Sequence, residues 1–352
     1  MKKKNLFTWA LAVTMLMIGS LVTPTVSAAD ANSNPDMAYS VKANIPDNQV
    51  DKKLTYFDLQ LNPGQQQDIS ISLTNSSKET STFNVNAIHA STNKNGVIDY
   101  SNAKVKKDKS FKYDWNKIIT NPKQTVTLAP GETKNVTFHI VMPEKGYKGI
   151  ILGGFHIQKQ VADNRASEKG VMIRNRFAYI IGLSLQNEST AVIPDLKLNK
   201  VKPTLDNSYT TITANLQNPT KTIIHKFNVT AKIYKKGSNQ VLYTTTKKDM
   251  GMAPNSNFDF PIDLNHDPIK PGKYTAKIHA TSEGKKYVWN LGGDFEIKAD
   301  KADKLNKDAV VLNKDWTWLW ILLGVIALIL VGVIVWLIMA LKKRNKDDED
   351  KK

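Results

Sequence analysis

The 352-residue chain contains no cysteine. This absence excludes a disulfide framework, thiol nucleophiles, thiolate metal ligands and a lipid-modified cysteine. Stability must therefore come from ordinary hydrophobic packing. The roughly 285 residues between the two ends of the chain are enough to build two domains, each with its own core.

Catalytic motifs are also missing. The sequence has no Gly-x-Ser-x-Gly elbow, no phosphate-binding loop and no dinucleotide fingerprint, and its six histidines lack the helical spacing of a zinc hydrolase. We therefore predict no enzyme activity, no cofactor and no metal site. Two carboxylates that cleave a sugar can meet in any fold, so wall hydrolysis stays open as a minor alternative.

The N-terminus is typical of a secretory leader. Lys2, Lys3 and Lys4 precede an apolar stretch at 6–21, and Val26-Ser27-Ala28 supplies the small residues of a cleavage site. We predict a signal peptide over 1–29, so the chain that follows is exported.

One long apolar run lies near the C-terminus. Trp316 to Leu341 is 26 residues without a charged side chain. As a helix it would be ~39 Å long, enough to cross a ~30 Å hydrocarbon core. Basic residues follow at once from Lys342, which predicts a cytoplasmic tail at 342–352 and a single-pass membrane protein. No Leu-Pro-x-Thr-Gly signal precedes the run, so we expect the membrane itself to be the anchor.

The exported part is basic. The leader and tail hold nine of the 49 basic and four of the 32 acidic residues, which leaves 40 against 28, or about +12 outside. Such a surface attracts polyanions, and outside a thick-walled, Gram-positive type of cell these are wall polymers and the membrane surface rather than nucleic acid. The lysines are scattered, however, so a merely solvated surface is an equal alternative.

The exported part has the pattern of antiparallel sheets. Apolar and polar residues alternate in short runs such as 68–73 and 82–88, and Asn95-Gly96 predicts a hairpin turn. Type II turns are expected before further strands at Pro63-Gly64, Pro130-Gly131, Pro254-Asn255 and Pro271-Gly272. We predict an all-β fold of two tandem immunoglobulin-like β-sandwiches at 37–187 and 190–298, followed by a juxtamembrane stalk at 299–315, the transmembrane helix at 316–341 and the tail.

A glycine-rich segment stands out at 146–155. Glycines inside a strand-like apolar run indicate a bulge or a close approach by another backbone. Because bare backbone beside an aromatic ring can dock a strand or a sugar, this segment supplies the candidate partner-binding residues. A tightly packed internal strand is the alternative. The candidates are Tyr147, Gly153, Gly154 and Phe155.

Several phrases resemble the WxL-interacting proteins of Gram-positive cell surfaces. In the first half they are Asn48-Gln49, Tyr56-Phe57-Asp58-Leu59, Pro63-Gly64-Gln65, residues 92–100 and residues 148–155. In the second half they are Tyr179-Ile180-Ile181-Gly182, Pro194-Asp195-Leu196 and residues 252–258. The resemblance also covers the leader, the two domains and the terminal helix, which is nearly the whole chain.

The resemblance implies a non-enzymatic adhesion scaffold at the cell membrane. It implies that the first domain binds peptidoglycan, that the second binds host matrix proteins, and that secreted WxL proteins are partners held non-covalently. An alternative is a structural stalk or folding helper for exported proteins that does not itself touch the wall.

Overall fold

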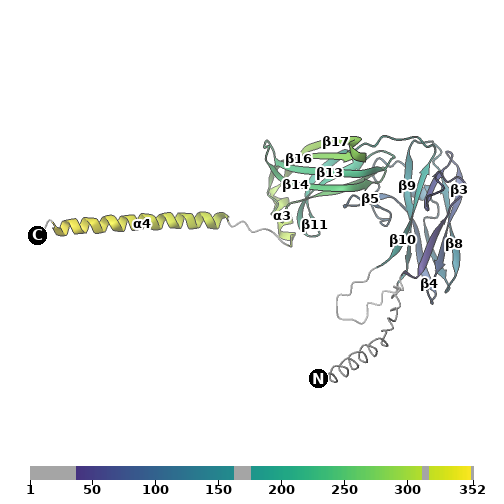
Figure 1. The fold of residues 1–352 in the computed structure, drawn as a ribbon, viewed down its shortest axis with the longest axis horizontal. Coiled ribbons are helices and arrows are strands. Elements are labelled where there is room, and N and C mark those ends of the chain that lie inside the picture. Colours follow the sequence, from purple (N-terminus) through teal and green to yellow (C-terminus); the bar gives the residue numbers. More distant parts are fainter. Residues whose placement is uncertain (1–36, 162–175, 311–316, 350–352) are drawn as a thin grey trace, which may run out of the picture. The chain divides into compact units, whose positions relative to one another are not determined.

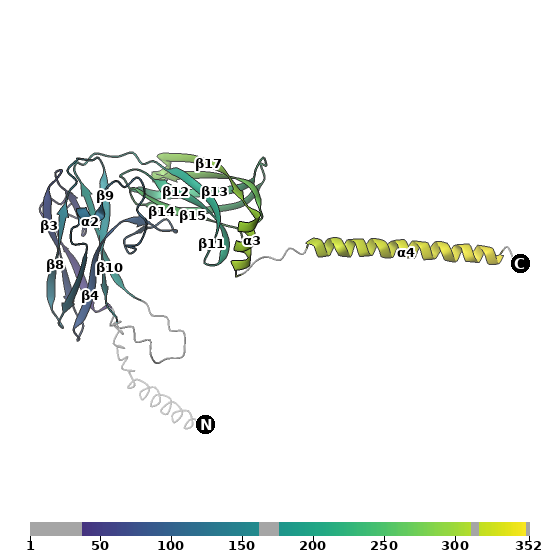
Figure 2. The same cartoon turned by 180° about the vertical axis from the view of Figure 1, so that it is seen from behind.

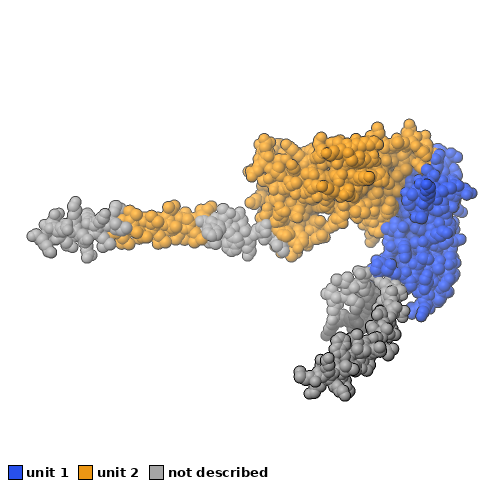
Figure 3. All heavy atoms as spheres, in the orientation of Figure 1, with its two compact units in different colours: residues 1–89, 113–146, 153–185 blue, residues 90–112, 147–152, 186–352 orange. Residues whose placement is uncertain are grey.

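The computed structural model describes residues 37–161, 176–310 and 317–349, which form a mostly β structure (Figure 1). The predicted signal peptide and the residues after 349 lie outside this range. The described part divides into two compact units, coloured separately in Figure 3. Antiparallel strand pairs build most of each unit, as the period of two in the sequence predicts.

Unit 1 contains a three-stranded and a five-stranded sheet. The orders are β1-β3-β8 and β2-β10-β9-β4-β7. The first comprises β1 (Tyr39–Asn44), β3 (Gln66–Asn75) and β8 (Thr133–Val141). The second comprises β2 (Phe57–Gln60), β4 (Ser81–His89), β7 (Lys123–Leu128), β9 (Ile150–Lys159) and β10 (Ala178–Gln186), and a short helix α2 (Trp115–Ile118) precedes β7.

The inner faces of these two sheets share one aromatic core. The ring of Phe155 on β9 lies 4.4 Å from that of Phe138 on β8 and 5.8 Å from that of Phe57 on β2, between centroids. Tyr39 on β1 packs 5.0 Å from Phe83 on β4. All four phenylalanines are fully buried, and burying each contributes roughly 2–3 kcal/mol. Packing of this kind replaces the missing disulfide.

Unit 2 also contains two main antiparallel sheets. Their orders are β11-β12-β15 and β14-β13-β16-β17, and the strands of the first are labelled in Figure 2. The hairpin β5-β6 is a separate two-stranded sheet. The strands are β5 (Ser91–Thr92), β6 (Ile98–Asp99), β11 (Lys197–Asp206), β12 (Tyr209–Asn218), β13 (Ile224–Lys235), β14 (Val241–Met252), β15 (Ser256–Asp263), β16 (Gly272–Ser282) and β17 (Tyr287–Ile297), and a 3-10 turn η2 (Glu283–Lys285) joins the last two.

The predicted stalk is wrong in its first part. Residues Ala299–Asp308 form a helix, α3, whose Ala302 and Leu305 are buried in the core shared by the two sheets of unit 2. These two residues are three apart and so lie on one helix face. The side chain of Asn306 accepts from the backbone N–H of Ile269 and donates to its carbonyl, at 2.8 and 2.9 Å. This segment therefore belongs to unit 2 and is not a free spacer.

The two units are interleaved along the sequence. Unit 2 takes residues 90–112 and 147–152 in addition to those from 186 onward, while unit 1 takes the remainder. The chain therefore passes between the units five times. The predicted domains, 37–187 and 190–298, are each one continuous segment, whereas each unit of the structure is made of three separate segments.

Three of the four predicted turns have the expected backbone. The fourth prediction is wrong, because Gly272 has a φ of 152° and is the first residue of β16. Gly64, Gly131 and Asn255 adopt φ of 70°, 72° and 47°, the left-handed region that the third position of these turns requires. The hairpin β5-β6 confirms the Asn95-Gly96 prediction, with the N–H of Gly96 donating to the carbonyl of Asn93.

The predicted C-terminal helix is present as α4 (Thr317–Glu349). The part of the chain that the structure describes contains no helix whose length and hydropathy together suffice for a membrane span. The prediction that this segment is helical is confirmed.

Candidate functional site

The outer face of the five-stranded sheet carries a ladder of uncharged polar side chains. Along β4, β7 and β9 the buried residues alternate with polar ones, so the polar set points away from the core. Register places Asn84 opposite both Gln158 and Thr125, and Asn86 opposite both His156 and Lys123. We name this surface the amide face; it comprises Thr82, Asn84, Asn86, Lys123, Thr125, Thr127, His156, Gln158 and Gln160.

Part of the amide face is already hydrogen bonded. The carboxamide oxygen of Asn84 accepts from Gln160 at 2.7 Å and from the hydroxyl of Thr125 at 3.4 Å. Among the described residues, the side-chain amides of Asn86 and Gln158 have no hydrogen-bond partner. Each can donate two hydrogen bonds and accept others, so the face retains unused capacity at its centre.

An exposed aromatic residue flanks the same sheet. Tyr56, just before β2, is 40% exposed and Ile180 on β10 is 47% exposed. The ring of Tyr56 lies over Gly182, where an added Cβ would come 3.6 Å from it. Partial burial first, and then the charges of Asp58 and Asp51, raise the pKa of Tyr56, so its hydroxyl is neutral and can donate at neutral pH.

The outer face of the other sheet in unit 1 is also polar, but its groups pair with one another. Asn44 donates to Ser70 at 2.9 Å and to Asn135 at 3.2 Å, and the hydroxyl of Ser72 lies within 2.9 Å of both asparagine oxygens. We name this surface the paired face; it comprises Asn44, Ser70, Ser72, Thr74, Thr133 and Asn135.

Two family models match the chain. The model described as "WxL Interacting Protein, peptidoglycan binding domain" matches residues 39–159, and that described as "WxL Interacting Protein, host binding domain" matches residues 168–307. Together they cover most of the sequence. The chain belongs to the WxL-interacting protein family. This confirms the resemblance seen in the sequence, and both models describe binding domains rather than catalytic ones.

The WxL-interacting chain is weakly similar to several solved structures, among them two chaperones. They include the class 5 fimbriae chaperone CfaA, with 14% identity over 67% of this chain and 95% of that one, at a TM-score of 0.27. The E. coli chaperone DraB has 11% identity over 74% of this chain and 97% of that one, at a TM-score of 0.26. At such TM-scores the matches say nothing about what this chain binds. A search of curated proteins gave no match.

The structure places the predicted contact residues inside the WxL-interacting protein. Phe155 is fully buried, Tyr147 is 7% exposed, and Gly153 and Gly154 are buried. A Cβ at Gly153 would lie 2.1 Å from the ring of Trp115, so glycine is needed there for close packing. The internal-strand alternative therefore describes these residues, and their prediction as an exposed contact is not supported.

The polar residues of the amide face were missed at the sequence level. The signal was present in the alternation of β9, where Phe155 and Ile157 face the core while His156 and Gln158 face outward. The prediction was based on the glycines and on Phe155 instead, and these residues face the core.

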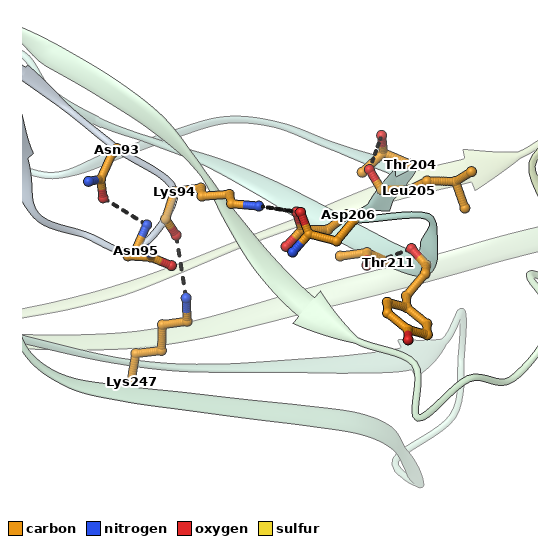
Figure 4. Close-up of polar contacts among 10 residues, drawn as sticks. Asn93, Lys94, Asn95, Thr204, Leu205, Asp206, Thr211 and Lys247 are labelled. Carbon is orange, nitrogen blue, oxygen red and sulfur yellow. Dashed lines mark hydrogen bonds and ion pairs between the residues drawn. The ribbon is translucent and has the colours of Figure 1, made fainter. Parts of the chain in front are cut away.

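Residues 90–112 fall within the match to the peptidoglycan-binding model but fold with unit 2. The hydroxyl of Thr92 lies 2.6 Å from that of Ser256 and accepts from the N–H of Ala253 at 3.0 Å. Figure 4 shows the ion pair between Lys94 and Asp206 and the hydrogen bond from Lys247 to the carbonyl of Lys94. We name residues 90–112 the clasp.

The clasp also closes the outer face of the β11-β12-β15 sheet. The buried carboxylate of Asp108 accepts from the side chain of Gln217 at 2.8 Å and from that of Asn257, as well as from the N–H and hydroxyl of Ser110. Burial alone would raise the pKa of Asp108, but these hydrogen bonds outweigh it and lower the pKa below its usual value. Asp108 is therefore ionised at neutral pH.

The described ranges contain no candidate metal site. Within them, no three histidine, aspartate or glutamate side chains are grouped so that they could hold an ion. His139 instead bonds Asp68 at 2.7 Å, and His279 bonds Asn290 at 2.8 Å. Both pairs lie on outer sheet faces.

Proposed function

We propose that unit 1 binds peptidoglycan through the amide face. The observation that carries the proposal is the pair of unpartnered amides, Asn86 and Gln158, on a mostly uncharged outer face in the domain that matches the peptidoglycan-binding model. On the paired face of the same unit, both asparagine side chains already take part in hydrogen bonds with their neighbours. Open hydrogen-bonding capacity on a rigid sheet is what a ligand can use.

The chemistry of the amide face suits a neutral glycan. Peptidoglycan sugars present hydroxyl and acetamido groups, and carboxamide side chains both donate to and accept from such groups. Tyr56 at the sheet edge adds an apolar ring face with a polar hydroxyl, which suits stacking against a sugar. Lys123 is the only lysine on this face, so charge is not its main recognition element.

The test is co-sedimentation of the full-length protein, in a nonionic detergent, with purified peptidoglycan stripped of its anionic polymers. The variant Asn86→Ala/Gln158→Ala should bind about tenfold more weakly, because each lost hydrogen bond contributes roughly 0.5–1.5 kcal/mol. Ser40→Ala/Thr137→Ala, on the outer side of the other sheet, is the matched control and should bind like the wild type.

Unchanged binding by the amide-face variant would refute the assignment of the site. Failure of the wild type to sediment at all would favour the alternative, a stalk or folding helper that does not touch the wall.

The wider proposal is a surface-retained adhesion scaffold. We infer that it holds secreted WxL proteins non-covalently, that unit 2 binds host matrix proteins, and that both units are immunoglobulin-like sandwiches. The family membership supports the partners, and the sheets of three and four antiparallel strands in unit 2 support the fold. Pull-down of WxL proteins by the full-length chain tests the first partner.

Retention at the membrane is part of the same proposal. Large apolar side chains of α4 from Ile321 to Leu337 are exposed, and the uncharged run 316–341 is followed by basic residues. Extraction of cell membranes at alkaline pH tests it: a membrane-embedded chain stays in the pellet, and a peripheral one is released.

A further inference from the structure

We propose that unit 2 carries a second binding surface, formed by residues 104–112 of the clasp, for a linear anionic polymer with a phosphodiester in each repeat. The segment reads Lys104-Val105-Lys106-Lys107-Asp108-Lys109-Ser110-Phe111-Lys112, with five lysines in nine residues. All five lysines are exposed. We name this segment the basic segment. The proposal is independent of the amide face and of peptidoglycan binding.

The basic segment is fixed to the sheet beneath it. Asp108 and Phe111 are both buried, at 8% and 3% exposure. Asp108 accepts from Gln217 on β12 and Asn257 on β15, and the hydroxyl of Ser110 accepts from Asn255 at 3.1 Å. The two inward side chains hold the backbone, and the lysines beside and between them are exposed. A lysine run in an unstructured tail would lack this preorganisation.

Acidic groups near the basic segment do not cancel its charge. Its single acid, Asp108, is engaged in the hydrogen bonds just described. Across the described residues, no carboxylate pairs with Lys104, Lys106, Lys109 or Lys112. The positive charge of these four lysines is therefore available to a ligand.

Neighbouring strands extend the positive surface. Lys197 on β11 is paired in register with Gln217, the residue that holds Asp108, and Lys200 pairs with Asn215 on the same face. Both lysines are exposed. Asp259 on that face pairs with Lys202 at 3.0 Å, and the charge of Lys200 also contributes to lowering its pKa. The basic segment and β11 together form a strip of positive charge, which fits an extended polymer better than a compact ion.

Two features favour a phosphate polymer over a lipid surface. Segments that lie on membranes insert Trp, Phe or Leu side chains, whereas the aromatic residue here, Phe111, is buried and only Val105 is exposed. The charges are all lysines, which act as point charges on phosphate rather than as planar, bidentate groups. Binding should then follow charge density and fall steeply with salt.

The experiment measures binding of the full-length protein, in nonionic detergent, to immobilised poly(glycerol phosphate) over a range of salt. The variant with Lys104, Lys106, Lys107 and Lys109 changed to Gln should bind at least about tenfold more weakly at low salt. Its plot of log affinity against log salt should also be shallower by roughly 3, as expected for four lost phosphate contacts.

Two matched variants make the result decisive. The same four positions changed to Arg keep the charge and should bind like the wild type. A control that removes four exposed lysines elsewhere on unit 2, namely Lys235, Lys248, Lys273 and Lys298, should change affinity less than twofold.

Three outcomes would overturn the proposal. These are equal binding by the Gln variant, equal losses in the Gln variant and the control, and a wild type that binds heparin or anionic lipid vesicles but not poly(glycerol phosphate). Because the peptidoglycan used above is stripped of anionic polymer, either proposal can fail without the other.

Discussion

The two outer faces of unit 1 have similar composition and opposite hydrogen-bonding states. On the paired face, Asn44, Ser72 and Asn135 donate and accept among themselves. On the amide face, Asn86 and Gln158 have no partner in the described part of the chain. A composition-based comparison would rank the faces as equal. The difference lies in where each side chain's hydrogen bonds go: both asparagines of the paired face bond their neighbours, whereas Asn86 and Gln158 keep all of their hydrogen-bonding capacity for a ligand.

The largest effect should come from the core that supports both faces. Phe155→Ala removes a ring that contacts Phe138 and Phe57, so we expect a loss of about 3–5 kcal/mol in the free energy of unfolding of unit 1. Chemical denaturation followed by the fluorescence of Trp115 would measure it. If the variant instead kept its stability and lost only ligand binding, Phe155 would be a contact residue after all.

The next largest loss of stability should come from a third outer face, that of the β11-β12-β15 sheet. There the carboxylate of Asp108 accepts hydrogen bonds from the side-chain amides of Gln217 and Asn257. Asp108→Ala leaves the Gln217 and Asn257 amides without their acceptor, at a cost of roughly 2–3 kcal/mol in unit 2. Hydrogen exchange should show the clasp losing protection while unit 1 keeps its own. Asp108→Asn keeps the shape but not the charge and should recover only part of the loss.

The same residue predicts a pH dependence. The pKa of Asp108 is lower in the folded chain than in the unfolded one, so its stabilisation is complete above the unfolded pKa of about 4 and is lost as pH falls through the folded pKa. Thermal unfolding of the wild type should lose stability below about pH 4 more steeply than that of the Asp108→Ala variant. Parallel curves would contradict this role.

A smaller effect separates the two faces directly. Asn44→Ala breaks hydrogen bonds to Ser70, Ser72 and Asn135, so it should cost about 1 kcal/mol in stability and leave peptidoglycan binding unchanged. Asn86→Ala breaks none, so it should change stability by less than about 0.5 kcal/mol and weaken binding. Measuring both quantities on both variants tests the contrast; the reverse pattern would exchange the roles of the two faces.

The smallest effect should be common to both faces. Each has an exposed threonine pair, Thr74 with Thr133 at 2.8 Å and Thr82 with Thr127 at 3.0 Å. Thr133→Ala and Thr127→Ala should each cost under about 0.5 kcal/mol in the free energy of unfolding, because solvent replaces the lost partner. A large loss in one alone would mean that the two faces differ in packing as well as in hydrogen bonding.

Much of the fold follows from local sequence. The β-rich character, the hairpin at Asn95-Gly96 and the left-handed residues Gly64, Gly131 and Asn255 all follow from side-chain period and turn chemistry within a few residues. The assignment of the clasp does not, since the contact between Thr92 and Ser256 joins residues 164 positions apart. No local pattern marks such a contact.

The candidate site was predictable only in part. The segment chosen from the sequence contains β9, which is a strand of the amide face, but the residues chosen from it face the core. The alternation of side chains along a strand is enough to predict that Phe155 and His156 face opposite sides of the sheet. Two facts depend on register: that Asn86 lies opposite His156, and that both asparagines of the paired face bond their neighbours. Two polar-faced strands do not specify their register by themselves.

The interleaving of the clasp bears on how such a protein can be inherited. A copy of residues 168–307 moved by recombination to another gene would leave behind Thr92, Asp108 and the turn whose Gly96 carbonyl accepts from Gly251. In the transferred domain, the side chains of Gln217 and Asn257 and the N–H of Gly251 would lack their hydrogen-bond acceptors. Selection should therefore keep the two halves together as a single heritable cassette, with partner specificity diversifying on the outward side chains and not by exchange of whole domains.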